Sequence, residues 1–172
     1  MLTFDDIIDS FARVCPKKIV ISDDIRSLSY SNLQYNGSNL ATFFKKYKII
    51  KGDRVALLSF NRIEFAEILY ATSKLGVIIM PINFRLSKEE IASIVKDANP
   101  KFFLYERAFF KTINYLVKNN FLDKSMALCI DTKNYFKLLT KTKNTYHLNF
   151  KNSKKNDDWS LMYTSGTTGN PK

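Results

Sequence analysis

The chain has 172 residues, of which 45% are hydrophobic and 14% aromatic, which suits one domain with a buried core and excludes a disordered tail. Its net charge of +11 comes mostly from scattered lysines, and the densest basic stretch, Lys133 to Lys155, favours a solvated surface over a weak anion-attracting patch. The most apolar region, Phe65 to Phe84, is interrupted by two charged residues and a proline, which excludes a membrane span.

The N-terminal third predicts a helix, a hairpin and a second helix. Apolar residues recur at helical spacing from Phe4 to Phe11, and Pro16 ends that helix. Two short β-prone runs, 18–22 and 26–29, are separated by two aspartates and predict a hairpin. The second helix has one apolar face, made by Leu33, Gly37, Leu40, Phe44 and Tyr47. The acidic start of the chain lacks the basic residues of a secretory signal, and we expect a cytoplasmic protein with reduced Cys15 and Cys129.

From residue 54 onward, strands and helices are predicted to alternate. The expected strands are 54–60, 77–82, 101–105 and 126–131. Helices are expected between them, with apolar stripes at 65–75, 91–98 and 109–117. Gly76 is placed to end the first of these helices, and Ser87 with Glu90 forms a capping box at the start of the second. Residues 134–158 predict a short helix followed by a surface connection.

This alternation predicts an α/β fold: a mostly parallel sheet with helices on both faces, joined by right-handed crossovers. In open sheets of this type, ligands bind beyond the carboxyl ends of the strands. A predicted final strand at Leu161–Tyr163 leads into the last residues of the chain, so those residues are expected to lie at a ligand-binding position.

The last stretch, LMYTSGTTGNPK from Leu161 to Lys172, has the composition of a phosphate-binding loop. Its glycines let a ligand approach the backbone, and its hydroxyls, N–H groups and lysine are donors for charged oxygens. The spacing differs from the usual phosphate loop, in which lysine directly follows the second glycine. On composition alone, a flexible linker is an equally good interpretation.

The complete string Y-T-S-G-T-T-G-x-P-K resembles the phosphate-binding signature of the adenylate-forming, or AMP-binding, enzymes. The block from Gly52 to Ile91 is also similar to acyl-CoA synthetases over its whole length, and two details favour that branch: the string NFRL after Pro81, and Thr167 where peptide-synthetase loops often carry serine. The string SLSYSNL resembles the first short motif of the family as a whole. The resemblance covers most of the chain, with residues 134–158 matching poorly. It favours acyl-CoA synthetases, enzymes of fatty acid metabolism among them, over peptide-synthetase adenylation domains.

The resemblance implies a ligase that uses ATP, Mg²⁺ and coenzyme A. A carboxylic acid reacts with ATP to give an acyl-adenylate and pyrophosphate, and the coenzyme A thiol then displaces AMP. By similarity, the β- and γ-phosphates of ATP would be held by the signature residues Thr164, Ser165, Gly166, Thr167, Thr168 and Gly169, assisted by Lys172. Tyr163 is expected to pack its ring and take no part in binding.

The family chain continues beyond this signature, and the later part supplies the adenine pocket, the metal-binding glutamate, most of the acyl pocket and a mobile C-terminal domain. Residues 1–172 are therefore expected to form the N-terminal part of an AMP-binding domain, incomplete and truncated within the phosphate loop. Alone they are expected to be inactive, and a separately encoded remainder would complete them. The resemblance leaves the carboxylic acid substrate open.

Two other classes of function remain as alternatives. A non-catalytic interaction module would keep the α/β subdomain and have no affinity for nucleotide. A basic nucleic-acid binder would hold DNA only through charge, since the sequence contains no recognisable nucleic-acid motif. His147 lies in a Lys/Asn-rich region and is expected at the surface.

Overall fold

The computed structural model of the chain describes residues 2–140 and 156–164. The helices of these residues are α1 Phe4–Val14, α2 Tyr30–Lys46, α3 Ile63–Leu75, α4 Lys88–Ala98, α5 Phe110–Lys118 and α6 Lys133–Thr140. The strands are β1 Ile19–Ser22, β2 Ser27–Ser29, β3 Arg54–Leu58, β4 Ile78–Pro81, β5 Phe102–Tyr105 and β6 Ala127–Cys129. Two single-turn 3₁₀ helices, η1 Arg107–Phe109 and η2 Lys124–Met126, complete the described elements.

The central sheet is parallel, with the strand order β4-β3-β5-β6. Val55 of β3 is paired with Ile79 on one side and with Phe102 on the other, so β3 lies inside the sheet. The hairpin β1–β2 forms a separate antiparallel pair. The predicted α/β class, with a mostly parallel sheet, is confirmed.

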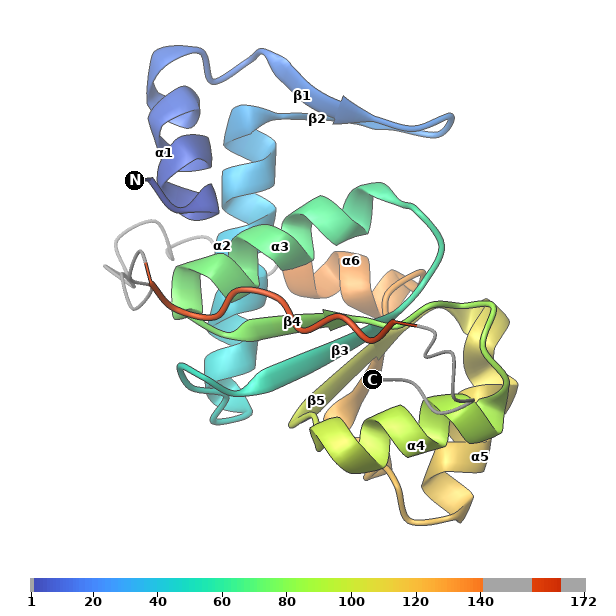
Figure 1. Cartoon of the computed structure of the whole chain (residues 1–172). Helices are drawn as coiled ribbons and strands as arrows, with labels where there is room; N and C mark the ends of the chain where they lie inside the picture. Colours follow the sequence, from blue (N-terminus) through green and yellow to red (C-terminus); the bar gives the residue numbers. More distant parts are fainter. Residues whose placement is uncertain (1, 141–155, 165–172) are drawn as a thin grey trace.

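Helices cover both faces of the sheet, as Figure 1 shows. On one face, buried side chains of α2, α3 and α6 pack on the strands, among them Phe44, Ile68 and Leu139. On the other face, α4 and α5 bury Ile91, Ile94, Val95, Ile113 and Leu116 against the strands. These faces are the ones that the apolar stripes of the sequence predict.

An additional N-terminal layer lies on α2 and α3. Ile8 of α1 and Leu28 of the hairpin share a buried cluster with Leu33 of α2 and Tyr70 of α3. The contact between α2 and α3 is close at Gly37, where an added Cβ would lie 2.3 Å from Cδ1 of Tyr70. Because Gly37 has no side chain, α2 and α3 can pack this closely.

Three local signals of the sequence correspond to the observed helix ends. The Ser87 hydroxyl accepts from the Glu90 N–H at 3.2 Å, while the Glu90 carboxylate accepts from the Ser87 N–H at 2.7 Å. Gly76 ends α3 with a φ of 66°. Asn99 ends α4 with a φ of 44°, directly before Pro100. The predicted capping box and the helix end predicted at Gly76 are confirmed.

The predicted final strand over Leu161–Tyr163 is wrong in its extent. Parallel pairing with β4 is one bridge between Ser160 and Ile79, formed by Ile79 N–H to Trp159 O at 3.1 Å and Leu161 N–H to Ile79 O at 2.9 Å. The next bond of a parallel ladder would need an N–H at residue 81, and Pro81 has none. The proline in β4 therefore ends the pairing after one bridge.

None of the helices in the described part of the chain is long and apolar enough to cross a membrane.

Candidate functional site

The structure describes one residue of the predicted phosphate loop, Thr164, whose side chain is exposed. Ser165, Gly166, Thr167, Thr168, Gly169 and Lys172 lie outside the described residues. What the structure does show is the segment 156–164, which leads into the loop. The geometry of that segment determines where the loop begins.

The segment 156–164 is fixed to the rest of the fold along its length. The Lys51 ammonium forms a salt bridge with the Asp157 carboxylate at 2.6 Å, and the Trp159 ring stacks on Phe4 at 6.3 Å between centroids. The bridge at Ser160 then joins the segment to β4. The loop therefore follows directly from a part of the chain that is held in register with the sheet.

Tyr163 fixes the last described residues to α4. Leu161 and Tyr163 pack on the apolar cluster that α4 and α5 form with the sheet, and the Tyr163 hydroxyl donates a hydrogen bond to the Asp97 carboxylate. Burial, and then the carboxylate of Asp97, raise the pKa of Tyr163 to about 12, so the phenol stays a neutral donor. The ring packs, as the sequence predicts.

The segment runs beside β4 and in the same direction, as Figure 1 shows in red. Since the bridge is parallel, the chain is directed towards the carboxyl edge of the sheet when it reaches Thr164. The same edge contains the switch point between β3 and β5, because the connection after β3 crosses one face and the connection after β4 crosses the other. This is the position at which open α/β sheets bind their ligands.

Charged side chains fill the edge beyond β3 and β5. Glu106 is buried, and its carboxylate accepts from the Phe60 N–H at 2.8 Å. Burial raises the pKa of Glu106. Arg62 lies between two carboxylates, with Nε 3.0 Å from Glu64 Oε2 and Nη1 3.9 Å from Glu106 Oε2, and the hydrogen bond to Glu64 raises the pKa of Arg62. Because Arg62 is engaged with these carboxylates, we interpret it as structural.

A second polar contact lies just beyond the carboxyl end of β6. Asp131 accepts from the Arg107 N–H at 2.9 Å and from the Cys129 thiol at 3.0 Å. Burial and the Asp131 carboxylate raise the pKa of Cys129 to about 12, so this thiol stays protonated and unreactive at neutral pH. Sequence reasoning treats Cys129 as an isolated thiol, since nothing in its spacing indicates a bond to a residue two positions later.

Three phenylalanines gather on the loops that follow β3, β4 and β5. The Phe60 ring lies 4.9 Å from that of Phe84 and 5.1 Å from that of Phe109, measured between centroids. Phe60 and Phe84 are exposed, and the Arg85 guanidinium lies 5.7 Å from the Phe84 ring. The sequence analysis did not identify this cluster, because the three residues belong to different connections.

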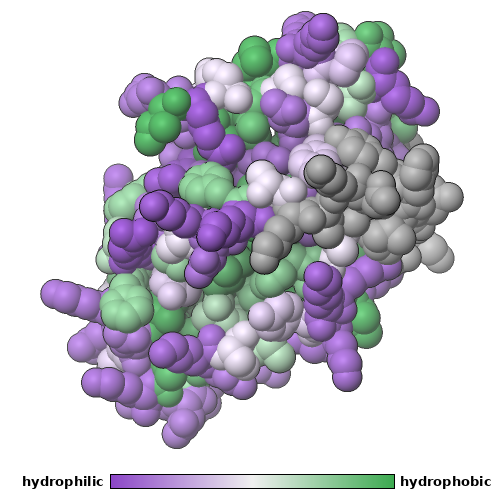
Figure 2. All heavy atoms as spheres, turned by 180° about the vertical axis from the view of Figure 1, so that it is seen from behind, coloured by the Kyte–Doolittle hydropathy of each residue, from purple (hydrophilic) through white to green (hydrophobic). Residues whose placement is uncertain are grey.

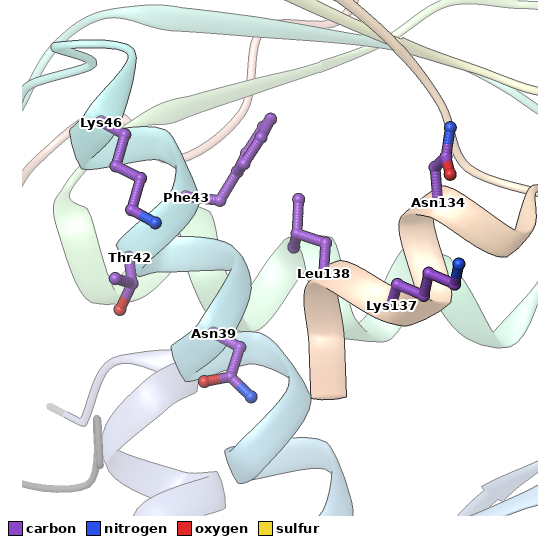
Figure 3. A pocket seen from close by; sticks show the side chains of 7 residues that line it. All are labelled: Asn39, Thr42, Phe43, Lys46, Asn134, Lys137 and Leu138. Atoms are coloured by element: carbon purple, nitrogen blue, oxygen red, sulfur yellow. The ribbon is translucent and has the colours of Figure 1, made fainter. Parts of the chain in front are cut away.

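A groove of about 320 Å³ lies between α2 and α6. Figure 3 shows Phe43 and Leu138 facing each other across it, with the two lysines Lys46 and Lys137 on separate helices. The remaining lining residues are polar: Asn39, Thr42 and Asn134. A second hollow, of about 410 Å³, lies at Gly52–Arg54, Asn99 and Lys101, at the amino edge of the sheet and opposite the carboxyl edge.

The described residues contain no group of three or more His, Cys, Asp or Glu side chains arranged to hold a metal ion. The carboxylates of the carboxyl edge are instead engaged with arginines and backbone N–H groups.

Comparisons with known proteins agree on one family. The family model described as "AMP-binding enzyme" matches residues 8–172. The chain is similar to 2-succinylbenzoate–CoA ligase of Oceanobacillus iheyensis, at 29% identity over 91% of this chain and 30% of that protein. It is also similar to the long-chain-fatty-acid–CoA ligase FadD13 of Mycobacterium tuberculosis, at 30% identity over 88% of this chain and 29% of that protein.

The fold is shared with a solved structure, the inhibitor-bound N-terminal domain of FACL13 from Mycobacterium tuberculosis. The two superpose with a TM-score of 0.81 at 24% identity, over 100% of this chain and 43% of that one. The chain thus spans about a third of the length of the curated relatives that it matches.

Proposed function

The chain belongs to the AMP-binding enzyme family, and from this we propose that it forms the N-terminal part of the adenylate-forming domain of an acyl-CoA ligase. The observation that carries the proposal is that the matched sequence and the described chain lead to the same place. The family match extends to residue 172, and the last described residues run beside β4 towards the carboxyl edge. The acyl-CoA ligase names of the relatives support the same class of reaction.

In this proposal the residues from Thr164 to Lys172 hold the β- and γ-phosphates of ATP. Hydroxyls and backbone N–H groups of Thr164, Ser165, Gly166, Thr167, Thr168 and Gly169 donate to phosphate oxygens, and Lys172 adds a positive charge. The anchoring of residues 156–164 fixes the position from which the loop begins. Mg²⁺, when bound, would neutralise part of the phosphate charge.

The reaction proposed for the complete enzyme is ATP-dependent thioester formation. The carboxylate oxygen of an acid attacks the α-phosphorus of ATP, the bond to the leaving pyrophosphate breaks, and an acyl-adenylate results. Coenzyme A sulfur then attacks the acyl carbon and releases AMP. We propose that residues 1–172 contribute phosphate binding to the first step and do not complete either step alone. The other groups would come from the part of the enzyme that corresponds to the remaining length of the relatives.

Phosphate binding is tested by calorimetric titration of the 172-residue chain with ATP and Mg²⁺. Thr167→Ala and Lys172→Ala are each expected to weaken binding about tenfold or more, since a hydrogen bond to a charged oxygen is worth roughly 1.5–3 kcal/mol. The matched controls are Thr140→Ala and Lys118→Ala, which change exposed residues on other elements and should leave the affinity unchanged. Absence of saturable binding in a sample that circular dichroism shows to be folded would refute the proposal.

Turnover is tested separately by ATP–pyrophosphate exchange with 2-succinylbenzoate and with a long-chain fatty acid, the acids that the relatives' names print. We expect no exchange with the 172-residue chain. Exchange that depends on either acid would show that these residues contain a complete adenylation site, and would contradict the proposed division of roles.

A further inference from the structure

Helix α1 has two apolar stripes, and the fold accounts for one of them. The inner stripe, Ile8 and Ala12, is buried against the neighbouring helices. The outer stripe consists of Ile7, Phe11 and Val14, which are 40%, 43% and 79% exposed. Their spacing of four and three residues places them on one side of the helix. One stripe is enough to attach a surface helix, so the outer stripe needs another explanation.

Aromatic side chains extend the outer stripe at both ends. Trp159, which is 47% exposed, stacks on Phe4 at the start of α1. Tyr30 stacks on Phe11 with 5.0 Å between centroids and 21° between the ring planes. We call the set of these residues the α1 ridge; it comprises Trp159, Phe4, Ile7, Phe11, Tyr30 and Val14. Figure 1 shows α1 on the outside of α2, and Figure 2 shows hydrophobic and hydrophilic residues mixed over this end of the molecule.

Basic side chains lie at the C-terminal end of the ridge. Arg13, Lys17 and Lys18 are exposed, and in the described part of the chain none of them has a salt-bridge partner. Two of the three aspartates of α1 are used inside the fold, and the third, Asp6, accepts from the Thr3 N–H at the start of the helix. Asp9 forms a salt bridge with Lys74, and Asp5 is buried and accepts a hydrogen bond from the Ser73 hydroxyl at 2.6 Å. The outer side of α1 therefore combines apolar groups with positive charge.

We propose that the α1 ridge is a membrane-surface contact that lies on anionic lipid. Helices that lie in the bilayer interface combine aromatic and aliphatic groups with lysine and arginine, and their binding depends on apolar area together with attraction to anionic headgroups. Trp and Tyr at the ends of the ridge are the side chains enriched at membrane interfaces. The net charge of +11 favours an anionic surface and opposes a second copy of the chain as the occupant. The inference is independent of nucleotide binding.

Trp159 provides a direct probe, because it is the one tryptophan of the sequence. The 172-residue chain is mixed with vesicles of equal amounts of phosphatidylserine and phosphatidylcholine, and with vesicles of phosphatidylcholine alone. We expect co-sedimentation with the mixed vesicles only. The Trp159 emission should shift to shorter wavelength, and brominated lipid should quench it, since both signals require the ridge itself to enter the interface.

Two pairs of variants separate the ridge from general charge attraction. Phe11→Gln with Val14→Gln removes apolar area and is expected to weaken vesicle binding about tenfold or more; Phe110→Gln, on the exposed side of α5, is its control. Lys17→Glu with Lys18→Glu reverses charge beside the ridge, and Lys111→Glu with Lys118→Glu makes the same change of net charge on α5. The first charge pair should weaken binding about tenfold and the second much less.

Each other outcome would overturn the proposal. Equal losses in both charge pairs, without a shift of the Trp159 emission, would show attraction of the whole basic protein. Binding unaffected by the ridge substitutions would place the contact elsewhere. A dimer seen by light scattering without lipid, and abolished by Phe11→Gln with Val14→Gln, would make a second copy the occupant. Circular dichroism verifies that each variant is folded.

Discussion

The two faces of the central sheet are built differently. The face covered by α4 and α5 is a continuous apolar cluster, in which Ile91, Val95 and Leu116 pack on the strands. The face covered by α2, α3 and α6 also has an apolar core, but its outer side contains buried charge. Glu64 and Glu67 of α3 are 1% and 0% exposed. The difference indicates that hydrophobic burial attaches one layer, while the other is also positioned by polar contacts.

Those polar contacts join four elements that are distant in sequence. Arg26, beside the hairpin, places Nη2 3.0 Å from Glu64 and Nη1 3.3 Å from Glu67. Glu67 also accepts from the Asn36 amide of α2 at 2.8 Å and from the Tyr135 hydroxyl of α6 at 3.0 Å. A buried carboxylate is costly unless it is paired and hydrogen-bonded, so this network defines how the hairpin, α2, α3 and α6 fit together.

The largest expected effect follows from removing the cation of this network. Arg26→Ala leaves two buried carboxylates without that partner, and should lower the free energy of unfolding by about 3 kcal/mol. Arg26 is 26% exposed, which keeps the figure at the lower end of the range for buried pairs. Urea denaturation measures the loss. Arg85→Ala, whose side chain meets the exposed Phe84 ring, is the control and should cost less than 1 kcal/mol.

If Arg26→Ala costs no more than Arg85→Ala, the polar face does not depend on its ion pairs, and the contrast between the two faces is one of composition only.

A second prediction uses pH to distinguish two carboxylates, Glu67 and Asp9, that lie on the side of the sheet covered by α2 and α3. Burial raises the pKa of Glu67 above its ordinary 4.5, against the lowering effects of Arg26, Asn36 and Tyr135. Below pH 4.5 Glu67 is protonated in the folded and the unfolded chain; above it, the folded chain alone bears the cost of a buried charge. Relative to Glu67→Gln, the stability of the natural chain should therefore fall as pH rises from 4.5 through the raised folded-state pKa of Glu67.

Asp9 is the matched control, with the opposite sign. Burial would raise its pKa, but hydrogen bonds from Lys74, Tyr70 and Gln34 outweigh burial and hold the pKa below 3.8. The stability that Asp9 contributes relative to Asp9→Asn should be complete above pH 3.8 and decline as pH falls through the folded-state pKa. Urea denaturation across this range checks both; a pH-independent difference for Glu67→Gln above pH 4.5 would contradict the assignment.

The same contrast explains what the sequence could predict. Local signals specify the elements: the capping box at Ser87, the αL glycine at Gly76, and the apolar periodicity of each strand and helix are all found in the structure. The single apolar stripe of α4 and that of α5 also predict how these helices cover their face of the sheet, because each helix is buried on one side only. Such information is contained within about a dozen neighbouring residues.

The polar face could not be predicted in this way. The sequence analysis gives α3 one buried stripe, yet α3 lies between the sheet and the N-terminal layer, and Glu64, Glu67 and Tyr70 are buried as well. Apart from the neighbouring Arg62, the partners of the two glutamates are 31 to 68 residues away in the chain, a separation that periodicity does not encode. In the candidate site, the loop was identified by resemblance, whereas its anchor at Asp97 and the single bridge imposed by Pro81 required the structure.

The smallest predicted effect concerns the apolar face, where Tyr163 makes a polar contact at its rim. Tyr163→Phe removes the hydroxyl that donates to Asp97 and keeps the ring, so the free energy of unfolding should fall by only about 0.5 kcal/mol. The local result should be larger than the global one. With this anchor weakened, the Leu161 N–H that bonds to Ile79 O should exchange with deuterium several-fold faster, while Ile91 of α4 should be unchanged.

Tyr115→Phe is the control, because Tyr115 meets Lys88 through its ring at 4.9 Å and should tolerate loss of the hydroxyl. If Tyr163→Phe speeds exchange at Leu161 and also weakens ATP binding, the anchor at Asp97 positions the phosphate loop, and the apolar face is the part of the molecule that supports the site. If exchange at Leu161 is unchanged, the bridge to Ile79 and the packed ring hold the segment without the hydroxyl, and Asp97 has no part in positioning the loop.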